Sequence, residues 1–191
     1  MKLPKGKILV FSAPSGGGKT TIVKEILKDF PTIIFSVSAT TRPKRKLETN
    51  GVEYFFLTEE EFKEKIKNNE FIEWEKFYDY YYGTLKSFIT GNIESGKTVL
   101  LELDVKGALT IKRLYPYAQL IYISPPSFDE LVKRLRQRQT ENETDFKKRI
   151  KRAKMELSLK DKFDYIIDNT DLDTAIRESK SLVNKILKEN Q

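Results

Sequence analysis

Short apolar runs alternate along the chain with segments in which apolar residues recur every three or four positions. The apolar runs lie at residues 8–11, 33–37, 98–103, 120–123 and 165–167. Their length is typical of buried strands. Helical spacing is found at residues 22–27, 106–114, 127–138, 144–160 and 172–187. This alternation predicts an α/β fold in which a mostly parallel sheet is covered by helices on both faces.

The middle of the chain, residues 36–92, interrupts this alternation and is expected to form an inserted lobe. The helix predicted there opens with a capping-box pair, Thr58 and Glu61. Gly83 is expected to break the extended aromatic segment. The expected elements are a strand at residues 53–57, a helix at 58–69, the extended segment at 71–82 and a short helix at 85–95.

A glycine-rich loop joins the first apolar run to the first helical segment. Residues 13–20 read Ala-Pro-Ser-Gly-Gly-Gly-Lys-Thr and match the P-loop template G-x-x-x-x-G-K-[ST], except that Ala13 replaces the first glycine. The glycines let backbone N–H groups converge on a polyphosphate. Lys19 adds positive charge at the outer phosphates, and Thr20 offers a hydroxyl to Mg²⁺. The methyl group of Ala13 is tolerable only if its φ is negative. A flexible linker is the alternative, but linkers seldom lie between a buried strand and a helix.

The residue types that are missing from the chain limit its chemistry. It contains no cysteine and no histidine. Disulfides, thiolate chemistry, Ser-His-Asp triads and histidine-based zinc sites are therefore excluded. Any catalysis must rely on positioning and charge, and phosphoryl transfer is the main reaction class of that kind.

The net charge of +7 has three interpretations: nucleic-acid binding, a solvated lysine-rich surface, or a cleft that holds several phosphates. Lysines and glutamates are interspersed along most of the chain, which favours the solvated surface over nucleic-acid binding. No apolar run approaches the roughly 20 residues of a membrane span. The basic start lacks the apolar core of a signal peptide. We therefore expect a cytoplasmic protein that binds neither nucleic acid nor membrane.

Two carboxylates lie at the end of the apolar run 98–103. Glu102 and Asp104 are two residues apart, so both are expected on one face of the strand. Open α/β sheets bind ligands at the carboxyl ends of their strands, where a carboxylate can hold Mg²⁺ through water or bind a ribose. A turn carboxylate is the alternative. Residues 104–107 also spell the D-x-x-G of GTPases, but the guanine-reading N-K-x-D of that class is absent after it.

Several other residues have both a functional and a structural interpretation. Arg42 and Arg45 lie in a proline-stiffened loop that suits bidentate phosphate binding, or they form an exposed basic loop. Glu73 lies between two apolar residues, Ile72 and Trp74, where its carboxylate needs hydrogen-bond donors, and the N–H groups of guanine would supply them. From this residue alone, however, a position on the surface of a strand is the favoured interpretation. Four tyrosines could bind a phosphate or pack in the core: Tyr54, Tyr80, Tyr81 and Tyr82.

Arginines lie on both sides of a polar break at residues 140–144. Such an arrangement suits a lid that closes over phosphates and adds charge to the transferring group. A solvated helix face is the alternative and covers some of these side chains. The arginines are Arg134, Arg136 and Arg138 before the break, and Arg149 and Arg152 after it.

Together these features resemble the guanylate kinase family over nearly the whole chain. The P-loop alone indicates only a nucleotide, whereas the Thr-Thr-Arg loop, the Tyr-Tyr-Gly-Thr segment and their order make the match specific. The matching stretches are residues 13–20, 36–45, 51–56, 70–74, 81–84, 103–107 and 125–127.

The resemblance implies a P-loop nucleoside monophosphate kinase fold. It also implies an enzyme of purine nucleotide metabolism that transfers phosphate from ATP to GMP and gives ADP and GDP. It implies Mg²⁺ bound with ATP, and dGMP as a further acceptor. The acceptor is a phosphate whose second pKa is about 6, so it needs no general base at pH 7. The implied parts are a core at residues 1–35, 93–124 and 157–191, a GMP-binding lobe at about 36–92 and a helical lid at about 125–156.

The resemblance also implies roles for individual residues. Catalytic roles fall to Lys19, Arg42, Arg134, Arg138 and Arg149. ATP would be bound by Ala13, Pro14, Ser15, Gly16, Gly17, Gly18, Lys19, Thr20, Thr21 and Asn169, the last near the adenine. GMP would be bound by Arg42, Arg45, Tyr54 and Tyr82 at its phosphate, and by Ser38, Glu73, Thr84 and Asp104 at its guanine. Mg²⁺ would be held by Thr20, with Glu102 as a further candidate.

The chain departs from the family pattern in places. Glu102 replaces a usual aspartate, Lys106 a common glutamine and Gln139 a common glycine, and the proline of the arginine loop is displaced by one position. None of these changes removes a group that the reaction requires. Two other functions remain open: a non-catalytic phosphopeptide-binding module of the same fold, disfavoured by the intact P-loop, and a P-loop kinase with another acceptor, disfavoured by Glu73 and Ser38.

Overall fold

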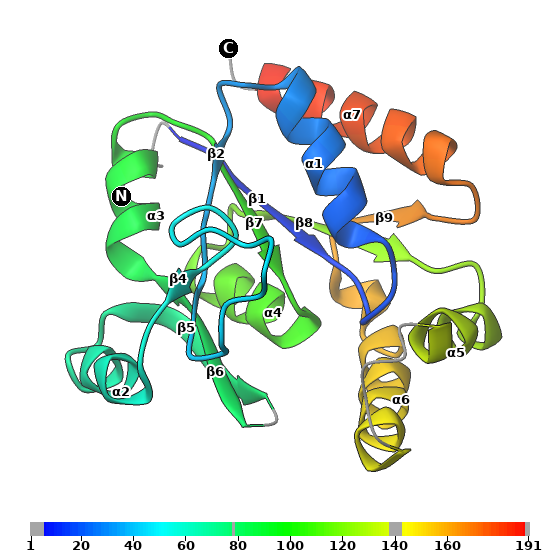
Figure 1. Cartoon of the computed structure of the whole chain (residues 1–191). Helices are drawn as coiled ribbons and strands as arrows, with labels where there is room; N and C mark the ends of the chain where they lie inside the picture. Colours follow the sequence, from blue (N-terminus) through cyan, green and yellow to red (C-terminus); the bar gives the residue numbers. More distant parts are fainter. Residues whose placement is uncertain (1–5, 78, 138–142, 190–191) are drawn as a thin grey trace. The chain divides into compact units, whose positions relative to one another are not determined.

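The computed structural model describes residues 6–77, 79–137 and 143–189. The chain divides into two compact units (Figure 1). The first unit comprises Met1–Ile8 and Ile34–Leu101, and the second comprises Leu9–Ile33 and Glu102–Gln191. No helix within the described ranges is long and apolar enough to cross a membrane.

Parallel strands form the centre of the second unit. Strand β8 (Gln119–Ser124) lies between β1 (Ile8–Ser12) and β9 (Tyr165–Asp168), with Val10 opposite Leu120 and Ile123 opposite Ile167. Every residue of β1 is buried, as expected for a parallel strand covered on both faces. The predicted α/β fold with a parallel sheet flanked by helices is therefore confirmed.

Helices of the second unit cover these strands. Helices α1 (Lys19–Asp29) and α7 (Leu172–Lys188) pack against each other, and α7 also contacts β9 (Figure 1). Helix α4 (Val105–Leu114) contacts β8. Helices α5 (Phe128–Gln137) and α6 (Glu143–Leu157) pack together through Leu131, Leu135 and Ala153, and a short 3₁₀ turn (Lys160–Lys162) precedes β9.

A parallel strand pair and a separate four-stranded sheet form the first unit. Strand β2 (Ile34–Phe35) pairs with β7 (Val99–Leu103). The four-stranded sheet has the order β4-β3-β6-β5, in which β3 and β4 are parallel and the other pairs are antiparallel. Its strands are β3 (Ala39–Thr40), β4 (Phe55–Phe56), β5 (Phe71–Phe77) and β6 (Tyr80–Leu85).

Helix α2 (Glu59–Lys67) contributes Phe62 to the hydrophobic core that covers this sheet. Helix α3 (Lys86–Glu94) follows β6. The predicted capping box is confirmed, because Thr58 Oγ1 accepts the Glu61 N–H and the Glu61 carboxylate accepts the Thr58 N–H. Phe62 is fully buried and stacks on Phe71 and Tyr81, with ring centroids 4.3 and 5.3 Å away.

Three local predictions were wrong. The strand predicted at 33–37 is limited to Ile34–Phe35, because the Ile33 N–H closes a turn onto Phe30 O. The strand predicted at 53–57 starts only at Phe55, because the Gly51 N–H donates to Tyr54 O and Gly51 has a φ of +80°. Gly83 lies inside β6 instead of breaking it.

Gly83 allows close packing of aromatic side chains around the hairpin. A Cβ at this position would lie 2.9 Å from Phe71 Cδ1, 3.0 Å from Phe62 Cζ and 3.0 Å from Trp74 Cβ. These neighbours come from both β5 and the core helix α2, so the tight fit arises from tertiary packing.

We expect Gly83→Ala to lower the free energy of unfolding by about 1–3 kcal/mol, because the added methyl group overpacks this aromatic cluster. Gly91→Ala is the matched control, since a Cβ at Gly91 in α3 meets nothing within 4 Å. The control should stabilise the protein by up to about 1 kcal/mol through helix propensity. Urea unfolding of both variants tests this, and a Gly83→Ala protein as stable as the parent would contradict the packing argument.

Candidate active site

The P-loop of the second unit connects β1 to α1. Gly16 and Gly18 both have a φ of +89°, a conformation that glycine adopts without steric cost. Asn69 is the one non-glycine residue with a positive φ among those described. Ala13 therefore has the negative φ that its methyl group requires. The Gly17 N–H donates to Pro14 O at 2.9 Å and closes the loop.

Asn169 supports the P-loop backbone from the end of β9. Its side chain is buried, and its Nδ2 donates to Gly17 O at 2.8 Å. Its own N–H donates to Ser124 O at 2.8 Å, which anchors it to β8. A Cβ on Gly18 would lie 2.4 Å from this Nδ2. Asn169, expected near the adenine, thus contacts the phosphate loop directly.

The start of α1 is arranged to receive an anion. Gly18 caps the helix without a side-chain hydrogen bond, and the first turn carries no acidic residue. The N–H groups of a helix's first turn and the positive end of its dipole favour phosphate binding. A pocket lies at this point, lined by residues 13–21 and Glu102.

Lys19 and Thr20 both contact the end of β7. Lys19 Nζ donates to Leu103 O at 2.6 Å, and the Thr20 hydroxyl donates to the Glu102 carboxylate. A hydroxyl and a carboxylate side by side in a phosphate pocket fit Mg²⁺, which prefers oxygen ligands and is commonly held by one or two side chains together with substrate phosphates. Among the described residues, no group of three acidic, histidine or cysteine side chains could hold a metal ion.

The α5–α6 pair borders the P-loop. A Cβ on Gly16 would lie 3.3 Å from Leu131 Cδ1, so α5 packs closely on the loop. On α6, Arg149 Nη1 donates to Ser15 Oγ at 3.3 Å. Arg134 Nε donates to Glu130 Oε1 within α5 at 3.1 Å. Of the three arginines expected to act on the transferring phosphate, Arg149 therefore contacts the P-loop and Arg134 pairs within its own helix, whereas Arg138 lies outside the described residues.

Asp104 has a structural role at the end of β7. It is the N-cap of α4, where its Oδ1 accepts the Gly107 N–H at 2.7 Å, and its Oδ2 pairs with Arg152 Nη2. The D-x-x-G match is thus a helix cap in this structure. Asp104 lies one residue beyond the strand, whereas Glu102 lies within it and lines the pocket.

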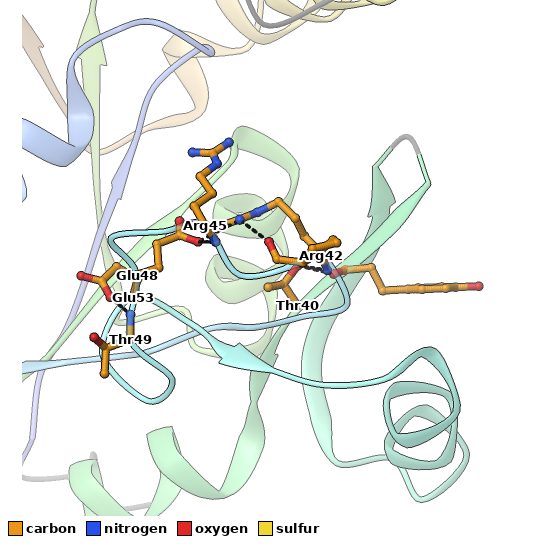
Figure 2. Close-up of polar contacts among 8 residues, drawn as sticks. Thr40, Arg42, Arg45, Glu48, Thr49 and Glu53 are labelled. Atoms are coloured by element: carbon orange, nitrogen blue, oxygen red, sulfur yellow. Dashed lines mark hydrogen bonds and ion pairs between the residues drawn. The ribbon is translucent and has the colours of Figure 1, made fainter.

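In the first unit, Arg42 forms a bidentate ion pair with Glu48. Arg42 Nη1 donates to Glu48 Oε2 at 2.9 Å and Nη2 to Oε1 at 2.8 Å. The loop is tightened further because the Arg45 N–H donates to Glu48 Oε2 at 2.8 Å (Figure 2). These hydrogen bonds, above all those from Arg42, lower the pKa of Glu48 to about 2.

Aromatic side chains surround the Arg42 guanidinium. Its carbon lies 5.3 Å from the ring centroid of Tyr54 and 5.6 Å from that of Phe56. The Tyr54 ring meets the Tyr82 ring edge-on at 6.1 Å. Three of the residues expected at the GMP phosphate, Arg42, Tyr54 and Tyr82, therefore lie together. The fourth, Arg45, is exposed, and Tyr81 packs in the core instead.

Glu73 and Thr84, both expected at the guanine, are opposite each other on β5 and β6. The buried Thr84 hydroxyl donates to Glu73 Oε1 at 2.5 Å. Ser38, the third residue of this group, is half-buried next to β3, and its carbonyl accepts the Phe55 N–H at 2.9 Å.

Sequence reasoning missed two groups of residues at these sites. Glu48 was not singled out, although its position three residues after Arg45 in a basic loop was a usable signal. Arg152 was noted only as one of several arginines, and its partner Glu156 was not noted. The contact of Arg152 with Asp104 at the end of β7 depends on how α6 packs, which no local pattern shows.

A glycine cradle between a strand and a helix, with Lys19, Thr20 and Glu102 around its pocket, is typical of P-loop nucleotide-binding proteins. The guanylate kinase family model matches residues 5–186. Similar proteins include the guanylate kinase of Thermotoga maritima, 46% identical over 94% of this chain and 86% of that one. The guanylate kinase of Bacteroides thetaiotaomicron is 44% identical over 98% of this chain and 93% of that one.

Solved structures agree with the sequence relatives. The crystal structure of guanylate kinase from Anaplasma phagocytophilum matches with a TM-score of 0.80 and 30% identity, covering 100% of this chain and 90% of that one. The chain belongs to the guanylate kinase family.

We expect Glu48→Gln to destabilise the protein by about 1–2 kcal/mol at pH 7, because it removes the charge that Arg42 binds in the folded state. The folded pKa of Glu48, about 2, lies below the ordinary value of 4.5. The stabilisation is therefore fully present above pH 4.5 and is lost as the pH falls toward about 2. Urea unfolding of both proteins at several pH values between 3 and 7 measures this, and a stability difference that stays constant would disprove the assignment.

Proposed function

We propose that this chain transfers the γ-phosphoryl group of ATP to GMP, giving ADP and GDP. Membership of the guanylate kinase family supports this reaction. The observation that carries the proposal is the intact donor site, in which Gly16 and Gly18 adopt the required conformation and Lys19, Thr20 and Glu102 line one pocket. A phosphopeptide-binding module of the same fold has no need of these groups and is not favoured.

At the donor site, the backbone N–H groups at the start of α1 would bind the ATP phosphates. Lys19 would exchange its contact with Leu103 O for the outer phosphates, and Asn169 would hold Gly17 in place beneath them. The pair of oxygen ligands formed by Thr20 and Glu102 supports Mg²⁺ as the accompanying ion. Bound there, it would neutralise part of the phosphate charge.

At the acceptor site, Arg42, Arg45, Tyr54 and Tyr82 would bind the GMP phosphate. The bidentate geometry that Arg42 makes with Glu48 is the geometry that guanidinium also makes with phosphate. Guanine would be bound by Ser38, Glu73, Thr84 and Asp104, with Glu73 accepting from its N1–H and N2–H₂ groups. Membership of the guanylate kinase family also supports dGMP as a second acceptor.

The transfer itself would proceed in line and without a general base. The GMP phosphate has a second pKa of about 6 and is mostly ionised at pH 7. The protein must therefore hold two polyanions together and neutralise their repulsion. Arg134, Arg138 and Arg149, in the proposed lid at about 125–156, would supply this charge. We further propose a GMP lobe at about 36–92 and a core formed by 1–35, 93–124 and 157–191. The protein would act in the cytoplasm, in purine nucleotide metabolism.

A coupled ADP-release assay with ATP and Mg²⁺ tests the reaction against GMP, dGMP, AMP, UMP and CMP. The proposal requires turnover with GMP well above that with AMP, UMP or CMP. A preference for another acceptor would indicate a different P-loop kinase. Turnover with none of them would favour the binding module. Omitting Mg²⁺ and adding EDTA should abolish ADP release.

We predict that Lys19→Ala lowers phosphoryl transfer at least about a hundredfold, because it removes the mobile charge at the outer phosphates. The fold should persist, since Lys19 lies at the surface of the pocket and its one described hydrogen bond is to a backbone oxygen. Lys24→Ala, an exposed lysine on the same helix, is the control and should keep parental turnover. Near-normal activity of Lys19→Ala would refute the role of the P-loop.

We predict that Glu73→Gln lowers kcat/KM for GMP about ten- to a hundredfold, since a charge-assisted acceptor is replaced by a neutral amide. The amide oxygen can still accept the Thr84 hydroxyl, so the fold should be kept. Discrimination against AMP should weaken, because AMP lacks both guanine donors. Glu64→Gln on the exposed face of α2 serves as control. Unchanged GMP and AMP turnover would remove Glu73 from the guanine site.

A further inference from the structure

Arg152 joins two carboxylates that come from different parts of the second unit. Its Nη2 pairs with Asp104 Oδ2 at the end of β7, and its Nε donates to Glu156 Oε1 on α6 at 2.8 Å. Arg152 and Glu156 are largely shielded from solvent, 16% and 3% exposed, whereas the Asp104 side chain is 33% exposed. Arg152 contacts each carboxylate through a different nitrogen, which a lysine with its single nitrogen cannot reproduce.

The contact of Arg152 with Glu156 is explained by the stability of the fold alone. Glu156 is buried, and its Oε2 has no hydrogen-bond partner among the described residues. Burial raises the pKa of Glu156, whereas the hydrogen bond from Arg152 opposes that rise. The other groups near it are Asp104, Lys19 and Tyr122, whose hydroxyl donates to the Glu156 carbonyl at 3.4 Å. A buried carboxylate that loses its counter-charge is strongly destabilising.

The second contact of Arg152, its ion pair with Asp104, does not supply a counter-charge to Glu156. It attaches α6 close to the residue that binds the P-loop lysine. Asp104 already caps α4 through its other oxygen. The preceding residue, Leu103, accepts Lys19 Nζ with its carbonyl. Arg152 therefore attaches α6 to the end of β7, where the P-loop lysine is bound.

Arg149 lies three residues before Arg152 on the same helix, and residues at this spacing share a face. Arg149 Nη1 donates to Ser15 of the P-loop at 3.3 Å. The two arginines thus make two successive attachments of α6, one to the P-loop and one to β7. The contact of Arg149 is long for a hydrogen bond, so its position depends on how the helix is held.

We propose that Arg152 is a positioning residue for phosphoryl transfer: by attaching α6 to Asp104 it holds Arg149 at the P-loop. This inference rests on the proposed function, because Arg149 is there assigned to the transferring phosphate. Arg152 itself acts through Arg149 and Asp104.

The test separates this role from the stabilisation of Glu156. Arg152→Lys keeps a positive charge near Glu156 but loses the two-nitrogen bridge. Arg152→Met combined with Glu156→Gln removes both buried charges, so the buried position 156 no longer carries a carboxylate without its counter-charge, while the more exposed Asp104 keeps the Gly107 N–H. We expect both proteins to unfold in urea closer to the parent than Arg152→Met alone. We also expect kcat for GMP to fall about ten- to a hundredfold in both, as misplacement of a catalytic group does.

A double-mutant cycle identifies Arg149 as the intermediary. In an Arg149→Met background, Arg152→Lys should cause little further loss of kcat, because coupled residues are not additive. Lys154→Met removes an exposed positive charge from the same helix and should leave kcat unchanged. Parental kcat in the Arg152→Met, Glu156→Gln double variant, or full additivity with Arg149→Met, would overturn the inference.

A measurement without substrate keeps the inference distinct from the proposed function. Amide hydrogen exchange in residues 146–152 should be faster in Arg152→Lys than in the parent and unchanged in Lys154→Met. If the parent protein does not phosphorylate GMP, the proposed function fails, and the exchange result still decides whether Arg152 holds α6. Unchanged exchange in Arg152→Lys would overturn the inference whichever acceptor is used.

Discussion

The left-handed conformation of two glycines determines the path of the P-loop, and the donor site depends on that path. Gly16 and Gly18 share a φ of +89° and reverse the chain between β1 and α1. The amide of Asn169 then holds the carbonyl of Gly17 at 2.8 Å. A side chain at Gly18 would occupy the space of that amide. Because the loop is fixed in this way, α1 starts at Lys19, and both Lys19 and Thr20 reach the end of β7.

In each of the two units, cationic side chains are held by acceptors of the same unit. Arg42 is bound by Glu48, Lys19 by Leu103 O, and Arg152 by Asp104 and Glu156. Each pair fixes a long side chain, which reduces the conformational entropy that ligand binding would otherwise cost. The contacts are also of the kind that phosphate oxygens make. In the proposed reaction, phosphate oxygens would take the place of Glu48 on Arg42 and of Leu103 O on Lys19.

The sequence was sufficient where the determining interactions are local. Helix positions, the capping box of Thr58 and Glu61 and the negative φ of Ala13 all follow from neighbouring residues. The sequence was insufficient where contacts between distant segments determine the local structure. Gly83 remains in a strand because it pairs with Ala39 of β3 and with Trp74 of β5, and its missing Cβ leaves room for the side chains of α2 and β5. The partners Arg152 and Asp104 are 48 residues apart and meet only because α6 returns to the end of β7.

The two carboxylates at the end of β7 illustrate why a local pattern could not assign their roles. Alternation along a strand would direct Glu102 and Asp104 to the same face. Strand β7 ends at Leu103, however, so Asp104 adopts the backbone of a helix cap, with φ −73° and ψ 174°. Glu102 remains beside Thr20, where an oxygen ligand for Mg²⁺ is useful, whereas Asp104 binds Gly107 and Arg152. Glu102 therefore lines the phosphate pocket, whereas Asp104 joins the start of α4 to Arg152 of α6.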